Sequence, residues 1–284
     1  YGEKFVIRIL DQRHHNVALD QIGMSEAMLK KIRKLIARPH GFIIVTGPTG
    51  SGKTTTLYAM LKELHAPDKN IITLEDPVEY LISGITQGQI YPKAGFSFAK
   101  GIRALLRQDP DVAMIGEIRD CESARIAIEA ALTGHVVLST LHTNDAAGAV
   151  ARLMDMGIEP FLLNASLCGV IAQRLVRRLC QYCKIAYTPS EQEQILMAEY
   201  GIDCRQLFKA VGCDQCKQLG FKGRIGIFEL LEIDENLREL IIKHPRLHDI
   251  YQQAVANGMV PMQQDAIQKL QAGITTLSEI LRVI

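Results

Sequence analysis

The sequence predicts an α/β fold built on a doubly wound parallel sheet. Short, β-branched and almost wholly apolar runs alternate with segments whose apolar residues recur at helical spacing. Such runs are typical of parallel strands buried on both faces, because the intervening helices cover the sheet. A phosphate-binding motif between the first run and its helix favours the same class. The expected strands are 42–46, 71–74, 112–115 and 136–139, and the helices between them are 54–64, 97–106 and 121–132.

The composition and charge of the chain limit the classes of protein to which it can belong. The chain has 284 residues, 48% hydrophobic and 22% charged, with 32 basic and 31 acidic side chains for a net charge of +1. These values predict about two globular domains and exclude disorder. Near-neutral charge disfavours non-specific nucleic-acid binding, and no apolar run approaches the ~18 residues of a membrane span. The chain opens without an initiator Met or a signal-peptide pattern, so we expect a fragment.

The N-terminal part predicts a strand, a linker and a helix in turn. Alternation of Val6, Arg8 and Leu10 indicates a strand over 5–10, interpreted as the last strand of a truncated domain, and 11–16 is polar like a linker. Residues 25–37 have helical spacing, with Ser25 as the N-cap and Pro39 and Gly41 as stop signals. After Asp145 we expect mostly helix to about residue 178, and helices again at 237–242, 247–256 and 277–283.

The motif G-x-x-x-x-G-K-[ST] occurs complete, directly after the first strand and at the start of its helix. Its glycines let the backbone N–H groups approach phosphate oxygens, and the helix N-terminus adds its positive dipole. Lys53 is expected to reach the β- and γ-phosphates, and Thr54 to offer its hydroxyl to Mg²⁺. The expected ATP-binding residues are Gly47, Pro48, Thr49, Gly50, Ser51, Gly52, Lys53, Thr54 and Thr55.

Two further strands end in carboxylates, Glu75 and Glu117. Ligands of open α/β sheets bind at the carboxyl ends of the strands. One acidic strand end is usually a solvated loop, but two in a sheet that carries a phosphate loop favour function. We expect Glu117 to hold Mg²⁺ through water together with Thr54, and either glutamate to polarise the attacking water.

The strand over 136–139 has a histidine near each end. His142 lies at the expected carboxyl edge, where it would sense a γ-phosphate, although a structural role is equally consistent with its position. His135 lies at the opposite end, and its spacing alone indicates packing.

Four of the seven cysteines form two C-x-x-C pairs, Cys180 with Cys183 and Cys213 with Cys216. Paired thiolates of this kind are typical of a tetrahedral structural Zn²⁺ site, and four sulfur ligands leave no open position for catalysis. Disulfides are the alternative, which the lack of a signal peptide disfavours. Basic residues around these pairs indicate a solvated face more often than a nucleic-acid site. The other three cysteines are expected to be buried hydrophobes.

Taken in order, these motifs resemble the secretion and pilus traffic ATPases, the hexameric motors of type II secretion and type IV pilus assembly. The phosphate loop corresponds to the family's Walker A, residues 73–79 to its Asp box, 103–111 to an arginine-bearing segment, 116–120 to an atypical Walker B and 134–145 to its His box. The resemblance extends from about residue 1 to the closing residues 278–284.

The resemblance implies a RecA-like P-loop NTPase core with an inserted four-cysteine zinc module and a small helical C-terminal subdomain. The implied divisions are a remnant of a PAS-like N-terminal domain and linker (1–16), the core (17–176), the zinc module (177–225) and the helical subdomain (226–284). Arginines close the site between subunits in this family, with intrachain salt bridging as the alternative for each, and Arg119 is best placed by its motif. The candidates are Arg8, Arg103, Arg107, Arg119 and Arg152.

The implied function is an ATP-hydrolysing motor that powers bacterial type II secretion from the cytoplasmic face of the inner membrane, with ATP, Mg²⁺ and Zn²⁺. Its implied partners are other copies in a hexamer, the cytoplasmic domain of an inner-membrane platform protein and a polytopic platform protein, without direct nucleic-acid binding. Alternatives are a pilus-extension ATPase, a nucleic-acid motor or a scaffold without turnover. The family's His box also gives His135 weight. The expected catalytic residues are Lys53, Glu75, Glu117, Arg119 and His142.

Overall fold

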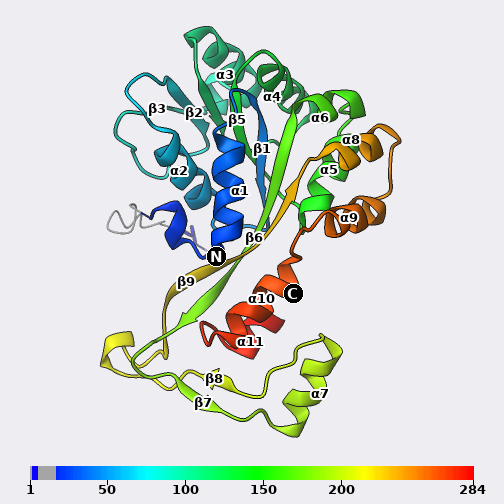
Figure 1. Ribbon diagram of the computed structural model, residues 1–284. Coiled ribbons are helices and arrows are strands. Elements are labelled where there is room, and N and C mark those ends of the chain that lie inside the picture. Colours follow the sequence, from blue (N-terminus) through cyan, green and yellow to red (C-terminus); the bar gives the residue numbers. More distant parts are fainter. Residues whose placement is uncertain (1, 6–16) are drawn as a thin grey trace.

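A seven-stranded sheet forms the centre of the molecule in the computed structural model, which describes residues 2–5 and 17–284 (Figure 1). Its order is β3-β2-β4-β5-β1-β6-β9, and every neighbouring pair is parallel except β6 and β9. The expected α/β class with a parallel sheet is therefore confirmed. Arg8 and the expected linker at 11–16 lie outside the described residues. The strands are β1 Gly41–Thr46, β2 Ile71–Glu75, β3 Thr86–Gln89, β4 Val112–Ile115, β5 Val136–Leu141, β6 Leu167–Leu179 and β9 Phe221–Glu232.

Helices cover both faces of this sheet and bury a separate apolar cluster on each. One face carries η2 (Leu19–Gln21), α1 (Glu26–Ile36) and α2 (Lys53–Leu64). Ser25 caps α1 as expected, because its hydroxyl accepts the N–H of Met28 at 3.2 Å. The other face carries α3 (Phe98–Leu105), α4 (Cys121–Leu132), α5 (Ala146–Asp155) and α6 (Pro160–Ser166). The short helices η3 (Pro92–Ala94) and η4 (Leu106–Gln108) flank α3.

The expected helix up to residue 178 is wrong, because the chain is helical only to Ser166 and then forms β6, a strand of 13 residues. β6 pairs with β1 and β9 at its edges, and the apolar clusters on the two sides of the sheet bury both faces of its first half. A run that is apolar on all sides has no periodicity that separates a strand from a helix. The strands β3 and β9 were also not expected. β3 is a polar edge strand, Thr-Gln-Gly-Gln, without an apolar alternation.

β6 and β9 continue out of the sheet as a two-stranded ribbon that carries the four cysteines at its far end (Figure 1). Between them lie β7 (Ile185–Tyr187), α7 (Glu191–Glu199), β8 (Leu207–Lys209) and η5 (Asp214–Cys216). The ribbon crosses both expected limits of the cysteine module, at 176/177 and 225/226. One uninterrupted strand, β6, therefore connects the part of the sheet beside the phosphate loop to the cysteines.

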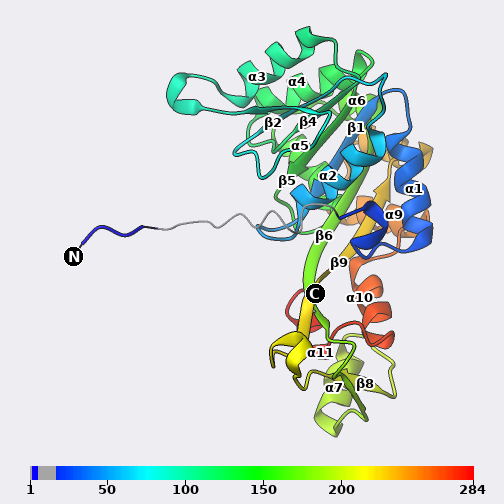
Figure 2. The same cartoon turned by 90° about the vertical axis from the view of Figure 1, so that its left-hand side faces the viewer.

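The C-terminal helices return to the core. α8 (Glu235–Ile242) packs on α6, α9 (Leu247–Ala256) on α5, α10 (Met262–Gln271) on β9 and α11 (Leu277–Leu281) on β6. The views in Figures 1 and 2 place α10 and α11 between the sheet and the cysteine module. α10 was not expected from the sequence. No helix within 2–5 and 17–284 is both long and apolar enough to cross a membrane.

A buried carboxylate ties these helices to the sheet. Glu229 on β9 accepts the N–H of Ala146 at 2.7 Å and that of Met262 at 3.1 Å, at the starts of α5 and α10. Burial raises the pKa of Glu229, although these two N–H groups oppose the rise. Through these two hydrogen bonds Glu229 joins the N-termini of α5 and α10 to β9. The dipoles of both helices favour a negative charge at this position.

Candidate active site

The phosphate loop turns tightly between β1 and α2. Gly47, Gly50 and Gly52 have φ values of +147°, +78° and +88°, which side chains rarely tolerate. A Cβ atom on Gly47 would also lie 2.3 Å from the carbonyl oxygen of Gln173. Gly47 and Gly52 are therefore required by close packing against β6 as well as by the turn.

Lys53, the first residue of α2, points back into the loop. Its Nζ donates to the carbonyl oxygens of Gly47 at 2.8 Å and Pro48 at 3.1 Å. Burial lowers the pKa of Lys53, and the charge of Glu117 opposes that shift. The ammonium group is thus held at the centre of the loop, close to a carboxylate from β4.

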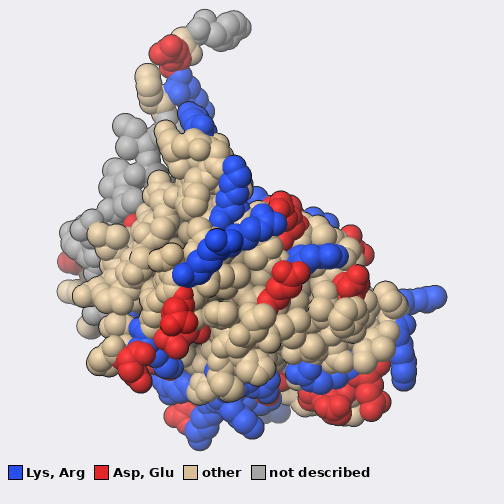
Figure 3. Space-filling model, turned by 90° about the horizontal axis from the view of Figure 1, so that it is seen from above, with Lys and Arg blue, Asp and Glu red and all other residues tan. Residues whose placement is uncertain are grey.

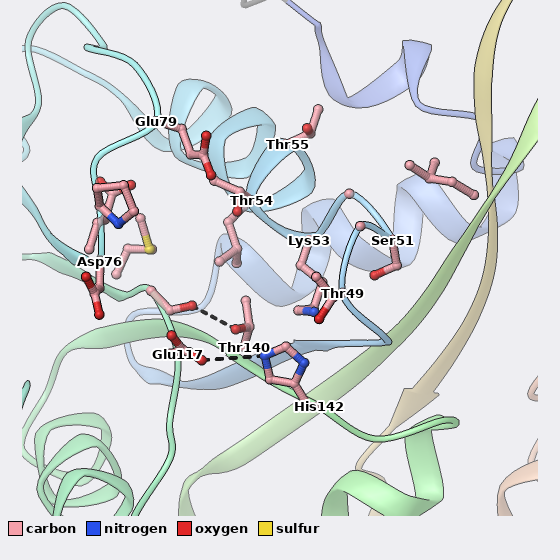
Figure 4. Close-up of a pocket in the computed structure, with 18 of the residues that line it drawn as sticks. Thr49, Ser51, Lys53, Thr54, Thr55, Asp76, Glu79, Glu117, Thr140 and His142 are labelled. Atoms are coloured by element: carbon pink, nitrogen blue, oxygen red, sulfur yellow. Dashed lines mark hydrogen bonds and ion pairs between the residues drawn. The ribbon is translucent and has the colours of Figure 1, made fainter. Parts of the chain in front are cut away.

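A cavity of about 650 Å³ opens beside the loop (Figure 4). It brings together residues from the ends of β2, β4 and β5, as expected for a ligand site at the carboxyl edge of a parallel sheet. The expected site residues that line it are Thr49, Gly50, Ser51, Gly52, Lys53, Thr54, Thr55, Glu75, Glu117 and His142.

Glu117 is the centre of an ion-pair network that faces this cavity. One carboxylate oxygen lies 2.5 Å from Arg119 and the other lies 3.5 Å from Nε2 of His142. Burial acts to raise the pKa of Glu117, but Arg119 and then His142 outweigh it, so the pKa is lowered overall. Arg119 also lies 3.9 Å from Asp76, so carboxylates that follow two strands, β2 and β4, flank one arginine.

Glu75, at the end of β2, has a different environment. Its side chain is buried and accepts hydrogen bonds from the hydroxyl of Tyr58, from Thr73 at 2.5 Å and from Gln87 at 3.1 Å. All three donors are neutral. Glu75 therefore has no cationic partner among these contacts, unlike Glu117.

Other expected residues lie away from the cavity. His135 is at the opposite end of β5, where its Nδ1 lies 2.9 Å from the carbonyl oxygen of Ala130 at the end of α4. Arg103 forms an intrachain pair with Glu122 at 2.7 Å. Arg107 and Arg152 are exposed on η4 and α5, and neither lines the cavity.

Sequence reasoning missed residues that support the loop. Gln173 on β6 is buried, donates to the carbonyl oxygen of Ser51 at 2.6 Å and accepts the hydroxyl of Thr56 at 2.6 Å. It thereby braces the phosphate loop against β6. Arg224 on β9 also lines the cavity. The only available signal for Gln173 was a polar residue inside an apolar run that we had assigned to a helix.

The four paired cysteines form a cluster at the far end of the β6–β9 ribbon, with all four sulfur atoms within 4.8 Å of one another. Three of the sulfur pairs, Cys180–Cys213, Cys183–Cys216 and Cys213–Cys216, measure 3.8, 3.8 and 3.7 Å. Zn–S bonds of about 2.3 Å in a tetrahedron give sulfur–sulfur edges of about 3.8 Å. All four are free thiols, so the cluster has the dimensions of a metal site rather than of disulfides.

Backbone N–H groups point at these sulfur atoms. Cys216 Sγ accepts from the N–H groups of Cys213 and Gly220, both at 3.2 Å, and Cys183 Sγ accepts from Gly212 at 3.4 Å. Burial acts to raise the pKa of Cys216, but the two N–H groups, together with the thiols of Cys213 and Cys183, lower it to about 7. Burial raises the pKa of Cys183 to about 11, so the pKa shifts of the two thiols are opposite in direction.

Comparison with known proteins decides the family. The sequence model of a family described as Type II/IV secretion system protein matches residues 1–282. The chain belongs to this family. The match includes the whole region from the phosphate loop to His142.

Two curated members of the family and one solved structure illustrate the similarity. The chain is 49% identical over its whole length to Type II secretion system ATPase E of Vibrio cholerae, of which it covers 56%. It is 46% identical over 99% of its length to Type IV pilus assembly ATPase PilB of Thermus thermophilus, covering 32% of that protein. The chain thus spans about half or less of these relatives. The crystal structure of the pilus retraction motor PilT with bound ADP matches 98% of the chain and is itself covered to 69%, with a TM-score of 0.73 and 28% identity.

Proposed function

We propose that this chain is the ATP-hydrolysing part of a motor that powers type II secretion. The observation that supports it most is the single cavity in which a complete phosphate loop faces the Glu117 network and Glu75. Relatives named as a type II secretion ATPase and a pilus assembly ATPase support the same activity.

In this proposal Lys53 and the loop N–H groups bind the phosphates of ATP, and Thr54 and Glu117 hold Mg²⁺. The metal, when bound, neutralises charge that develops on the phosphates. Glu117 suits this task because its lowered pKa keeps it ionised at neutral pH. His142, 3.5 Å from Glu117, is placed to respond to the γ-phosphate.

We assign activation of the attacking water to Glu75. A general base must hold an accessible lone pair without losing its basicity to a cation. Arg119 and His142 lower the basicity of Glu117, whereas the donors to Glu75 are neutral and Glu75 still lines the cavity. Arg119 would stabilise charge in the transition state or act on the site of a neighbouring subunit. The other candidates for the inter-subunit role are Arg8, Arg103, Arg107 and Arg152.

We further propose that the four cysteines bind one Zn²⁺ with a structural role. The free thiols, their spacing and the N–H groups that face them support tetrahedral thiolate ligation. Because all four ligands are sulfur, no position is left for a reacting water. The metal would fix the end of the β6–β9 ribbon.

The working motor is proposed as a hexamer on the cytoplasmic face of a bacterial inner membrane, bound to the cytoplasmic domain of one platform protein and to a polytopic one. Pilus extension is the second candidate, because the pilus assembly ATPase is nearly as similar as the secretion ATPase. Direct nucleic-acid binding is not part of the proposal. On the face in Figure 3, basic and acidic side chains are interspersed, and the chain carries a net charge of only +1.

Stimulation of hydrolysis tests this choice of partner. The full-length protein that contains this chain would be assayed for phosphate release alone, with duplex and single-stranded DNA, and with acidic-lipid vesicles that carry the membrane partner's cytoplasmic domain. We expect the vesicles to raise the rate and DNA to leave it unchanged. Stimulation by DNA and not by the vesicles would instead establish a nucleic-acid motor.

A further inference from the structure

We propose that Tyr58, Thr73 and Gln87 form a clamp that positions the Glu75 carboxylate for ATP hydrolysis, and that Tyr58 couples this carboxylate to the phosphate-loop helix. The inference rests on the proposed ATPase function. Tyr58 is a positioning residue here, because it acts through Glu75 and does not line the cavity.

The buried hydroxyl of Tyr58 fixes the first oxygen of Glu75. Its side chain is completely buried on α2, and its hydroxyl donates to one oxygen of Glu75. Burial and the Glu75 carboxylate raise the pKa of Tyr58, so the phenol stays protonated and remains a donor. A buried donor aimed at a buried carboxylate restricts the direction in which that carboxylate faces.

Thr73 and Gln87 restrict the second oxygen. Thr73, two residues before Glu75 on β2, donates at 2.5 Å, and Gln87 on the neighbouring strand β3 donates at 3.1 Å. Gln87 is itself fixed, because its other amide atom accepts the N–H of Ile82 at 2.6 Å. Both oxygens of Glu75 are therefore held by three different elements, α2, β2 and β3.

The clamp links two parts of the site that the chain keeps apart in sequence. α2 begins at Lys53, whose ammonium lies in the phosphate loop, and Tyr58 lies five positions later on the same helix. A shift of α2 when phosphates bind would move the Tyr58 hydroxyl and with it the Glu75 carboxylate. Nucleotide binding and orientation of the base are thereby connected through one hydrogen bond.

The test removes this hydrogen bond while it keeps the aromatic ring. In the full-length protein, Tyr58→Phe should lower kcat by about tenfold to a hundredfold, the range expected for one hydrogen bond to a charged group. The dissociation constant for ATP should change by less than about twofold, because Tyr58 touches no expected phosphate contact. Thr73→Val, which deletes another donor at constant shape, should lower kcat in the same way and serves if Tyr58→Phe does not fold.

Two controls separate positioning from general destabilisation. Tyr187→Phe removes a similar bond, from a tyrosine to Glu193 at 2.6 Å in the cysteine module, and should leave kcat unchanged. In a Glu75→Gln background, measured by single turnover, Tyr58→Phe should have no further effect, because it acts through that carboxylate. If folded Tyr58→Phe turned over at the wild-type rate, this inference would be overturned and the proposed function would stand. Fully additive losses of kcat in the Tyr58→Phe, Glu75→Gln double variant would have the same consequence. A wild-type protein without turnover would overturn the proposed function as well.

Discussion

Replacing Glu117 with glutamine is expected to lower phosphate release by at least about 100-fold while ATP still binds. The substitution keeps the shape of the side chain but removes the charge that faces Lys53, Arg119 and His142. In the proposed mechanism this charge holds Mg²⁺. The phosphate loop itself is untouched, so the binding of ATP measured with a fluorescent analogue should persist.

A matched variant controls for the loss of one negative charge. Glu129 lies exposed on α4, on the same connection between β4 and β5, and does not line the cavity. Glu129→Gln should hydrolyse ATP at the wild-type rate. If Glu117→Gln retained wild-type turnover, the role assigned to this strand end would be wrong.

Removal of the metal from the cysteine cluster is the second large effect that we expect. Structural zinc contributes about 10–16 kcal/mol of binding free energy in small domains, so the module should lose its fold when the metal is lost. Purified wild-type protein should contain about one equivalent of zinc, and Cys183→Ser should contain almost none. Amide hydrogen exchange across residues 180–220 should then become fast while the core sheet stays protected.

Cys204 provides the matched control within the same module. Its thiol donates to the carbonyl oxygen of Gln206 at 2.9 Å and is not part of the cluster. Cys204→Ser should therefore keep its zinc and its slow exchange. Less than about half an equivalent of zinc in wild-type protein purified without chelators would count against the site.

Sequence patterns predicted the half of the sheet that carries the phosphate loop. β1, β2, β4 and β5 lie within one or two residues of the expected ranges, because short apolar runs bounded by turn residues leave few alternatives. β6 failed for a physical reason. Its strand conformation is decided by pairing with β1 and β9, and the pairing with β9 joins residues such as Gly169 and Glu232, 63 positions apart in the chain. No local pattern contains that information.

The residues of the candidate site could also be predicted only in part. Glu75 and Glu117 could be selected because each follows a predicted strand in a sheet with a phosphate loop. Their different environments could not be predicted, because the neutral donors to Glu75 include Tyr58 on α2 and Gln87 on an unpredicted strand. The brace from Gln173 was missed for the same reason, since β6 was assigned to a helix.

Phosphate release by the full-length protein, assembled as hexamers and measured with and without Mg²⁺, tests the central claim most directly. We predict steady turnover that needs Mg²⁺ and that disappears in Lys53→Ala, because the Lys53 ammonium lies at the centre of the phosphate loop. Wild-type protein that releases no more phosphate than Lys53→Ala would contradict the account, as would an equal rate in the absence of the metal.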